Sequence, residues 1–138
     1  MGPRKNLEMT LDAFVEEFRD NENVGLVIKT NTSKNSLLDR LKCKAALTNK
    51  LASLGERKCK VYLLHGYMTE GQLNSLYNHE KIKCLVSTTH GEGFGLPLFE
   101  AACQGLPIIA PSWSGHVDFL YARVKDKNKK YRNKALFT

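Results

Sequence analysis

Apolar residues recur at intervals of three and four in four parts of the chain. This spacing places them on one face of a helix. The four predicted helices cover residues 7–18, residues 35–54, the stretch that follows Thr69 and residues 98–104. Asn6 is a candidate N-cap for the first helix, and Thr69 with Gln72 forms a capping box before the third. Gly55 and Gly105 are placed to end the second and fourth helices.

Between these helices the apolar residues form short continuous runs of strand length. The four runs cover residues 24–28, 61–64, 82–86 and 106–110. A continuous run, in place of an alternating one, predicts a strand that is covered on both faces. Strands that alternate with helices predict the α/β class, as a Rossmann-like parallel sheet with helices on both faces.

The composition indicates one globular domain in a soluble, cytoplasmic protein. The chain has 138 residues, of which 42% are hydrophobic and 25% are charged, values typical of a folded domain. It contains no transmembrane segment and no apolar signal region. The four cysteines have no metal-binding spacing, and His65, His79 and His116 are scattered, so we expect no metal site. Cys84 and Cys103 are predicted to be core residues.

Positive charge is in excess, with 21 Lys and Arg against 14 Asp and Glu, so the domain should attract anions. Much of the excess is close to the C-terminus, at Lys125, Lys127, Lys129, Lys130, Arg132 and Lys134. We interpret residues 122–138 as a solvated, truncated tail or loop after a domain at residues 1–121. The first helix begins without a preceding strand, which favours a fragment of a longer protein.

Glycines alternate in the loop that follows the third predicted strand, at Gly91, Gly93 and Gly95. Open α/β sheets bind ligands beyond the carboxyl ends of their strands, where this loop must lie. Glycine permits unusual dihedral angles and close approach of a ligand to the backbone. Pro97 favours a helix start, which would present the amides of Gly95 and Leu96 to a diphosphate.

Two carboxylates flank this glycine-rich turn, Glu92 before the helix and Glu100 close to its first turn. Carboxylates accept hydrogen bonds from sugar hydroxyls, often two at once. The turn and its two carboxylates therefore predict a site for a ligand that has both phosphates and hydroxyl groups.

The segments Glu92–Ala101 and Gly105–Ala110 resemble the signature of family 4 (group 1) glycosyltransferases, in their C-terminal nucleotide-sugar-binding domain. The resemblance implies the C-terminal half of a GT-B fold. It also implies that Glu100 binds the ribose and that Glu92 contacts the donor sugar. The amides of Gly93, Phe94, Gly95 and Leu96 would hold the diphosphate. A match of this length is far more specific than a lone Gly-x-Gly.

Weaker resemblances extend over residues 4–121. The Arg4-Lys5-Asn6 segment is similar to a basic element of the family, which implies that Lys5 pairs with the donor phosphates. The loop from His65 to Thr69 resembles the segment that flanks the nucleobase, which would place Tyr67 and Met68 beside the base. His90 is a further candidate for contact with the sugar or the leaving phosphate.

The family resemblance implies transfer of a sugar from a nucleoside-diphosphate donor with retention of configuration. No cofactor and no metal are expected. The acceptor site would belong to an N-terminal domain that this chain does not contain, so we expect the chain to bind the donor and to be nearly inactive alone.

Several alternatives stay open at this stage. The candidate residues also have purely structural explanations. Glu100 would be a helix-start carboxylate. Glu92 and Lys5 would be solvated charges, and His90 would be a histidine bonded to the loop backbone. Tyr67 and Met68 are equally explained as packing residues. The whole chain is also explained as a non-catalytic nucleotide-binding module, or less well as a nucleic-acid-binding domain driven by its basic tail. Few aromatic residues accompany those lysines, which disfavours single-strand binding.

Overall fold

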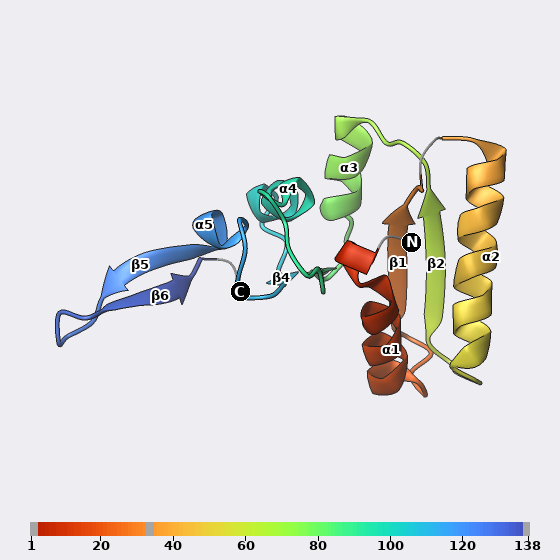
Figure 1. The fold of residues 1–138 in the computed structure, drawn as a ribbon, viewed down its shortest axis with the longest axis horizontal. Helices are drawn as coiled ribbons and strands as arrows, with labels where there is room; N and C mark the ends of the chain where they lie inside the picture. Colours follow the sequence, from red (N-terminus) through yellow and green to blue (C-terminus); the bar gives the residue numbers. More distant parts are fainter. Residues whose placement is uncertain (1–2, 33–34, 137–138) are drawn as a thin grey trace. The chain divides into compact units, whose positions relative to one another are not determined.

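The computed structural model describes residues 3–32 and 35–136, and Figure 1 shows the elements that they form. These residues divide into two units, one that ends at Met68 and one that begins at Thr69. Both units contain helices and a pair of parallel strands, which confirms the predicted α/β class. Among the described residues, no helix combines the length and the apolar character needed to cross a membrane.

The first unit is built around two parallel strands and two helices. Its elements are the 3-10 helix η1 (Pro3–Lys5), α1 (Leu7–Phe18), β1 (Gly25–Thr30), α2 (Leu37–Ser53) and β2 (Lys60–His65). The register pairs Gly25 with Lys60 and Thr30 with His65. Because the strands are parallel, Thr30 and His65 lie together at the carboxyl ends of β1 and β2. The C-terminal end of this sheet is therefore shared by the two loops that follow.

One face of the β1–β2 pair carries the core of the first unit. The buried cluster joins Leu11 and Val15 of α1 and Leu47 and Leu51 of α2 to Ile28 and Cys59. Leu26, two residues before Ile28, packs against the cluster, whereas Val27 between them is exposed. Successive strand residues point to opposite faces, so both helices pack on the face of Leu26 and Ile28. Within the described part of this unit, the opposite face of β1 carries Val27.

The second unit contains a shorter parallel pair and an antiparallel hairpin. Its elements are α3 (Glu70–Tyr77), β3 (Leu85–Val86), α4 (Leu96–Cys103), β4 (Ile108–Ile109), α5 (Val117–Leu120), β5 (Tyr121–Lys125) and β6 (Tyr131–Ala135). In the parallel pair, Leu85 lies opposite Ile108. A buried cluster of Tyr77, Ala101 and Leu106 packs beside this pair. The strands β3 and β4 occur where the sequence predicts them, but each has only two residues, and among the described residues they pair only with each other.

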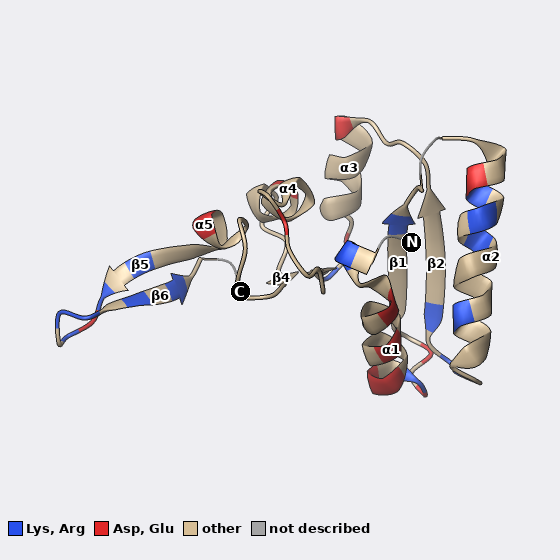
Figure 2. Ribbon diagram, viewed as in Figure 1, with Lys and Arg blue, Asp and Glu red and all other residues tan. Residues whose placement is uncertain are grey.

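The basic C-terminal segment, for which the sequence predicts a tail or loop at residues 122–138, contains a hairpin. β5 and β6 pair from Tyr121 with Ala135 to Lys125 with Tyr131. The side chain of Asp126 closes the turn by accepting hydrogen bonds from the amides of Asn128 (2.8 Å) and Lys130 (3.0 Å), as Asp commonly does in turns. Every residue of β6 is exposed, so the basic residues coloured blue there in Figure 2 are solvated as expected. Residues 137–138 lie outside the described residues.

Helix ends follow the sequence signals with one exception. Thr69 and Gln72 form the predicted capping box of α3, and Gly55 and Gly105 follow the ends of α2 and α4 with φ of 78° and 72°. Asn6 occupies the N-cap position of α1 with a φ of 49°, but its side chain forms no capping hydrogen bond with the helix.

Cys103 is exposed and Cys84 is half-buried, so the prediction that Cys103 is a core residue is wrong.

The capping box generates a prediction for stability. Thr69→Ala removes the side-chain acceptor for the Gln72 amide, and we expect a loss of about 1 kcal/mol in the free energy of unfolding. Thr48→Ala is the matched control, because Thr48 is an exposed residue inside α2. Urea unfolding followed by circular dichroism measures both. An equal effect of the two substitutions would contradict the role assigned to the box.

Candidate functional site

The glycine-rich loop follows the carboxyl end of β3, as the sequence predicts. β3 ends at Val86 and β4 ends at Ile109, and these strands run parallel. The loops at residues 87–95 and 110–116 therefore leave the same edge of the pair. In α/β proteins this edge is where ligands bind.

Hydrogen bonds join the two loops at Glu92. The hydroxyl of Ser114 donates to the backbone oxygen of Glu92 (2.6 Å) and accepts from its amide (2.8 Å). The amide of Gly115 donates to the same oxygen (3.0 Å). The indole of Trp113 donates to the backbone oxygen of His90 (3.2 Å). The backbone on both sides of Gly91 is therefore fixed by the neighbouring loop.

Glycine is required at two places where these loops meet. A Cβ atom on Gly115 would overlap the carbonyl oxygen of Gly93. Gly95 has a φ of 88° and a Cβ there would lie 3.1 Å from the Cβ of His116, a conformation and a contact that disfavour other residues. Gly93 is different, because a Cβ there would meet nothing within 4 Å. The open space beside Gly93 is available to a ligand.

The turn ends at the N-terminus of α4. Gly95 is the N-cap, Leu96 is the first helical residue and Pro97 is the second. The helix therefore begins one residue before Pro97, which the sequence predicts to start it. The amides of Leu98 and Phe99 both donate to the Gly95 oxygen, at 2.9 and 3.0 Å. In the described part of the chain the amides of Gly95 and Leu96 have no backbone acceptor. They form a pair of donors at the positive end of the helix, where Leu96 is exposed and Gly95 is buried.

Glu100 lies one turn beyond this N-terminus and is half-buried. It is the fifth residue of α4, whose first turn has no acidic residue, so the alternative of a helix-start carboxylate is wrong. It forms a hydrogen bond with Tyr77, which is only 9% exposed. Burial, together with the charge of Glu100 and this hydrogen bond, raises the pKa of Tyr77 to about 12. The Tyr77 hydroxyl therefore stays protonated and orients the carboxylate.

Three phenylalanine rings pack around the same turn. The centroid of Phe94 lies 5.4 Å from that of Phe99 and 5.0 Å from that of Phe119, and the last two are 5.3 Å apart. These distances are within the range of favourable aromatic pairs. The side chain of Phe94 therefore anchors the turn, while its backbone stays at the helix N-terminus.

The remaining predicted residues are accessible but belong to different parts of the chain. His90 is exposed in the second unit, and the bond of its backbone oxygen to Trp113 fixes its main chain. Lys5, in η1, is exposed, Tyr67 is 69% exposed and Met68 is half-buried. These three belong to the first unit, whereas the turn and both carboxylates belong to the second. The exposure of Tyr67 disfavours the alternative that it is a packing residue.

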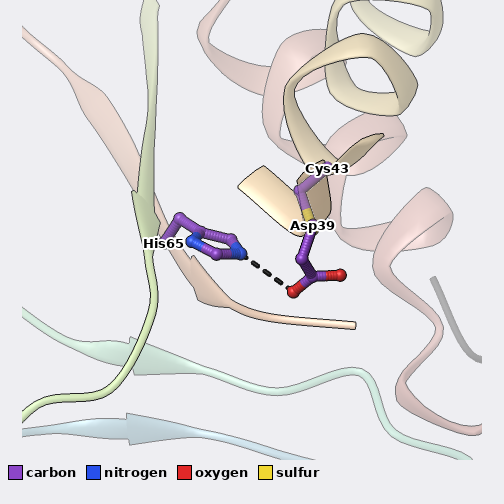
Figure 3. Close-up of side chains that lie close together, drawn as sticks. All are labelled: Asp39, Cys43 and His65. Carbon is purple, nitrogen blue, oxygen red and sulfur yellow. Dashed lines mark hydrogen bonds and ion pairs between the residues drawn. The ribbon is translucent and has the colours of Figure 1, made fainter. Parts of the chain in front are cut away.

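The structure also assembles a group that the sequence analysis missed. Asp39 and Cys43 of α2 and His65 at the end of β2 point toward one another (Figure 3), and their ligand atoms lie within 4.8 Å of one another. The spacing of Asp39 and Cys43, four residues apart, is the available sequence signal, since it puts both on one helix face. The histidine comes from a distant strand, which no local pattern indicates.

The contact between the two loops predicts a sharp effect at one glycine. Gly115→Ala forces the loops apart, so we expect a loss of about 1–3 kcal/mol in the free energy of unfolding. Gly71→Ala is the control, because a Cβ at this helical glycine meets nothing within 4 Å and alanine favours helices. Chemical unfolding of both variants makes the comparison. A Gly115→Ala variant as stable as the unmodified chain would contradict the observed loop contact.

The burial of Tyr77, with the charge of Glu100 and their hydrogen bond, predicts a stability change at high pH. The pKa rises from 10.0 in the unfolded chain to about 12 in the folded one, so the stabilisation is complete below pH 10 and is lost as pH rises toward 12. We expect Tyr77→Phe to lack this loss, which is on the order of 2 kcal/mol. Unfolding at several pH values compares the two chains, and parallel profiles would contradict the assignment. In a tyrosinate absorbance titration, Glu100→Gln should move the pKa of Tyr77 back toward 10.

Comparison with known proteins adds independent findings. A sequence model of the family described as glycosyl transferases group 1 matches residues 1–125. The chain is 34% identical over 111 residues to the serotype-specific mannosyltransferase WbdA of Escherichia coli, an alignment that covers 79% of the chain and 12% of WbdA. A second WbdA sequence of Escherichia coli matches with the same identity and coverage.

A solved structure of the GtfA/B complex aligns with a TM-score of 0.37 and 19% identity, over 81% of this chain and 25% of that one. The chain spans about 12% of the length of the curated relatives that it matches. The family match extends over nearly the whole chain and includes the glycine-rich turn with both of its carboxylates. The resemblance found in the sequence is confirmed, and the chain belongs to the group 1 glycosyltransferases.

Proposed function

We propose that this chain binds the nucleoside-diphosphate sugar from which a longer enzyme transfers its sugar. The observation that carries the proposal is the arrangement in the second unit. The amides of Gly95 and Leu96 at the start of α4 have no backbone acceptor in the described residues, Gly93 has open space beside it, and a half-buried carboxylate follows one turn later. This arrangement offers separate partners for the phosphates and for the hydroxyl groups of one ligand.

The diphosphate is proposed to bind at the amides of Gly95 and Leu96. A helix N-terminus offers both unpaired donors and a positive potential, which together favour phosphate. The excess of basic residues gives the chain a formal charge of +7 and adds a long-range attraction for an anionic ligand. Lys5 is proposed to supply a direct charge to the phosphates, as the family resemblance implies.

Glu100 is proposed to bind the ribose of the donor. Four residues of helix separate it from Leu96, a rise of about 6 Å, which is the scale of a ribose attached to a diphosphate. Its hydrogen bond with Tyr77 holds one side of the carboxylate, and a carboxylate has further acceptor positions for two hydroxyl groups. Tyr77 is thus a positioning residue for the ribose contact.

Glu92 is proposed to contact the transferred sugar, with His90 beside it. The backbone of Glu92 is fixed by Ser114 and Gly115, which reduces the entropy lost when its side chain engages a ligand. Tyr67 and Met68 are proposed to flank the base. Retention of configuration and the acceptor site on an N-terminal domain follow from the family resemblance alone and are part of this proposal.

The transferred sugar is proposed to be a hexose, with mannose the first to test. The matched relative is named a mannosyltransferase, and this chain aligns with only a small part of it. The donor experiment therefore includes a mannose-linked nucleotide beside glucose-linked ones, and it includes UDP, GDP and ADP to identify the base.

Isothermal titration of the 138-residue chain tests the proposal. One nucleoside diphosphate should bind with a stoichiometry of one, and Glu100→Gln should weaken it by about 10- to 100-fold, the cost of losing charged hydrogen bonds. Glu80→Gln is the matched control, because Glu80 is an exposed glutamate of the same unit outside the turn. It should leave the affinity unchanged.

Two results would contradict the proposal. Equal affinity of the Glu100→Gln and Glu80→Gln variants for the nucleoside diphosphate would show that Glu100 does not bind the ribose. Binding of an oligonucleotide with a steep salt dependence, in the absence of nucleotide binding, would instead favour a polyanion-binding function of the basic hairpin.

A further inference from the structure

Three side chains with metal-ligating atoms, none of them assigned to the donor, lie together in the first unit. Figure 3 shows Asp39 and Cys43, which come from α2, facing His65 at the end of β2. The Nε2 atom of His65 lies 2.9 Å from Oδ2 of Asp39. All three ligand atoms lie within 4.8 Å of one another. The fold therefore brings nitrogen, oxygen and sulfur donors to one point.

The group is buried. Asp39 is 5% exposed, Cys43 is 2% exposed and the side chain of His65 is 5% exposed. Burial of a carboxylate is costly unless hydrogen bonds or a positive partner balance it. A divalent cation would balance the carboxylate directly and would also be ligated by the imidazole and the thiolate.

The dimensions suit a tetrahedral ion. Zinc bonds of about 2.0–2.3 Å place neighbouring donors roughly 3.3–3.8 Å apart, and the three atoms here lie within a slightly larger limit of 4.8 Å. A small rotation of the His65 ring and of the Asp39 carboxyl would exchange their hydrogen bond for two bonds to one ion. Three protein ligands leave a fourth position for water or another small ligand.

Thr32 supports both ligands that come from α2. Its amide donates to Oδ2 of Asp39 (2.9 Å), and its hydroxyl lies 3.2 Å from the sulfur of Cys43. Contacts of this kind orient ligands in metal sites and raise the affinity for the ion. Thr32 follows β1 closely, so the contacts connect the ends of both parallel strands to the start of α2.

We propose that Asp39, Cys43 and His65 form a binding site for Zn²⁺. The donor set of one thiolate, one imidazole and one carboxylate suits zinc and disfavours Mg²⁺ and Ca²⁺, which prefer oxygen ligands. On binding, the thiol of Cys43 releases its proton to solvent. The ion would tie α2 to the end of β2, where the segment His65–Met68 begins. The proposed Zn²⁺ ligands are distinct from the residues proposed to bind the donor, and either proposal stands if the other fails.

Titration of the reduced 138-residue chain with Co²⁺ and Zn²⁺ tests the site. One equivalent of Co²⁺ should produce a sulfur-to-cobalt charge-transfer band, and one equivalent of Zn²⁺ should remove it. Zn²⁺ should also raise the Tm, because an ion that binds only the folded chain stabilises it. Cys103→Ser, which removes the exposed thiol, is the matched control and should bind like the unmodified chain.

Two substitutions at the site should give graded effects. Cys43→Ala should abolish the charge-transfer band and the rise in Tm. Thr32→Val keeps the ligands and removes only the hydroxyl near the sulfur, so it should weaken Zn²⁺ binding by about 10- to 100-fold. Circular dichroism confirms that each variant is folded.

The proposal is overturned if Co²⁺ gives no charge-transfer band with the unmodified chain, or if Cys43→Ala binds Zn²⁺ as tightly as Cys103→Ser does. In either case Cys43 is not a zinc ligand. The cobalt spectrum of the unmodified chain decides whether sulfur is a ligand even if a variant does not fold.

Discussion

The close contact between the loops after β3 and β4 is the constraint on which the candidate donor site depends. Ser114 bonds both backbone groups of Glu92, and Gly115 packs so closely on Gly93 that only a glycine fits there. These contacts fix the glycine-rich turn before any ligand arrives. A fixed turn holds the amides at the start of α4 in place, so binding need not bear the entropic cost of ordering a flexible loop.

The second support of the site comes from the core. Tyr77 belongs to the buried cluster with Ala101 and Leu106, and its hydroxyl bonds Glu100. The carboxylate of Glu100, which is proposed to bind the ribose, is therefore connected to the packing of α3 against α4. Residues that position a ligand partner from the core are hard to see in a sequence, because their own pattern is that of ordinary helix packing.

The sequence predicted the class, the parallel strands and the position of the turn, because hydrophobic periodicity and glycine spacing are local signals. It did not predict that both helices of the first unit pack on the face of Ile28, since a continuous apolar run does not tell which face a given helix covers. It also missed the β5–β6 hairpin, whose charged strands lack apolar alternation and depend on the turn at Asp126. The sequence also did not predict the contact of His65 with Asp39 and Cys43, because it joins residues that are far apart along the chain.

The central claim is that a nucleoside diphosphate binds at the N-terminus of α4. Nuclear magnetic resonance of the isotope-labelled chain tests it most directly, because each backbone amide reports its own contact. The account predicts that the amides of Gly93, Gly95 and Leu96 shift on saturation with the nucleotide, while those of β6 stay unchanged. Shifts confined to the lysine-rich hairpin, with the turn unaffected, would contradict it.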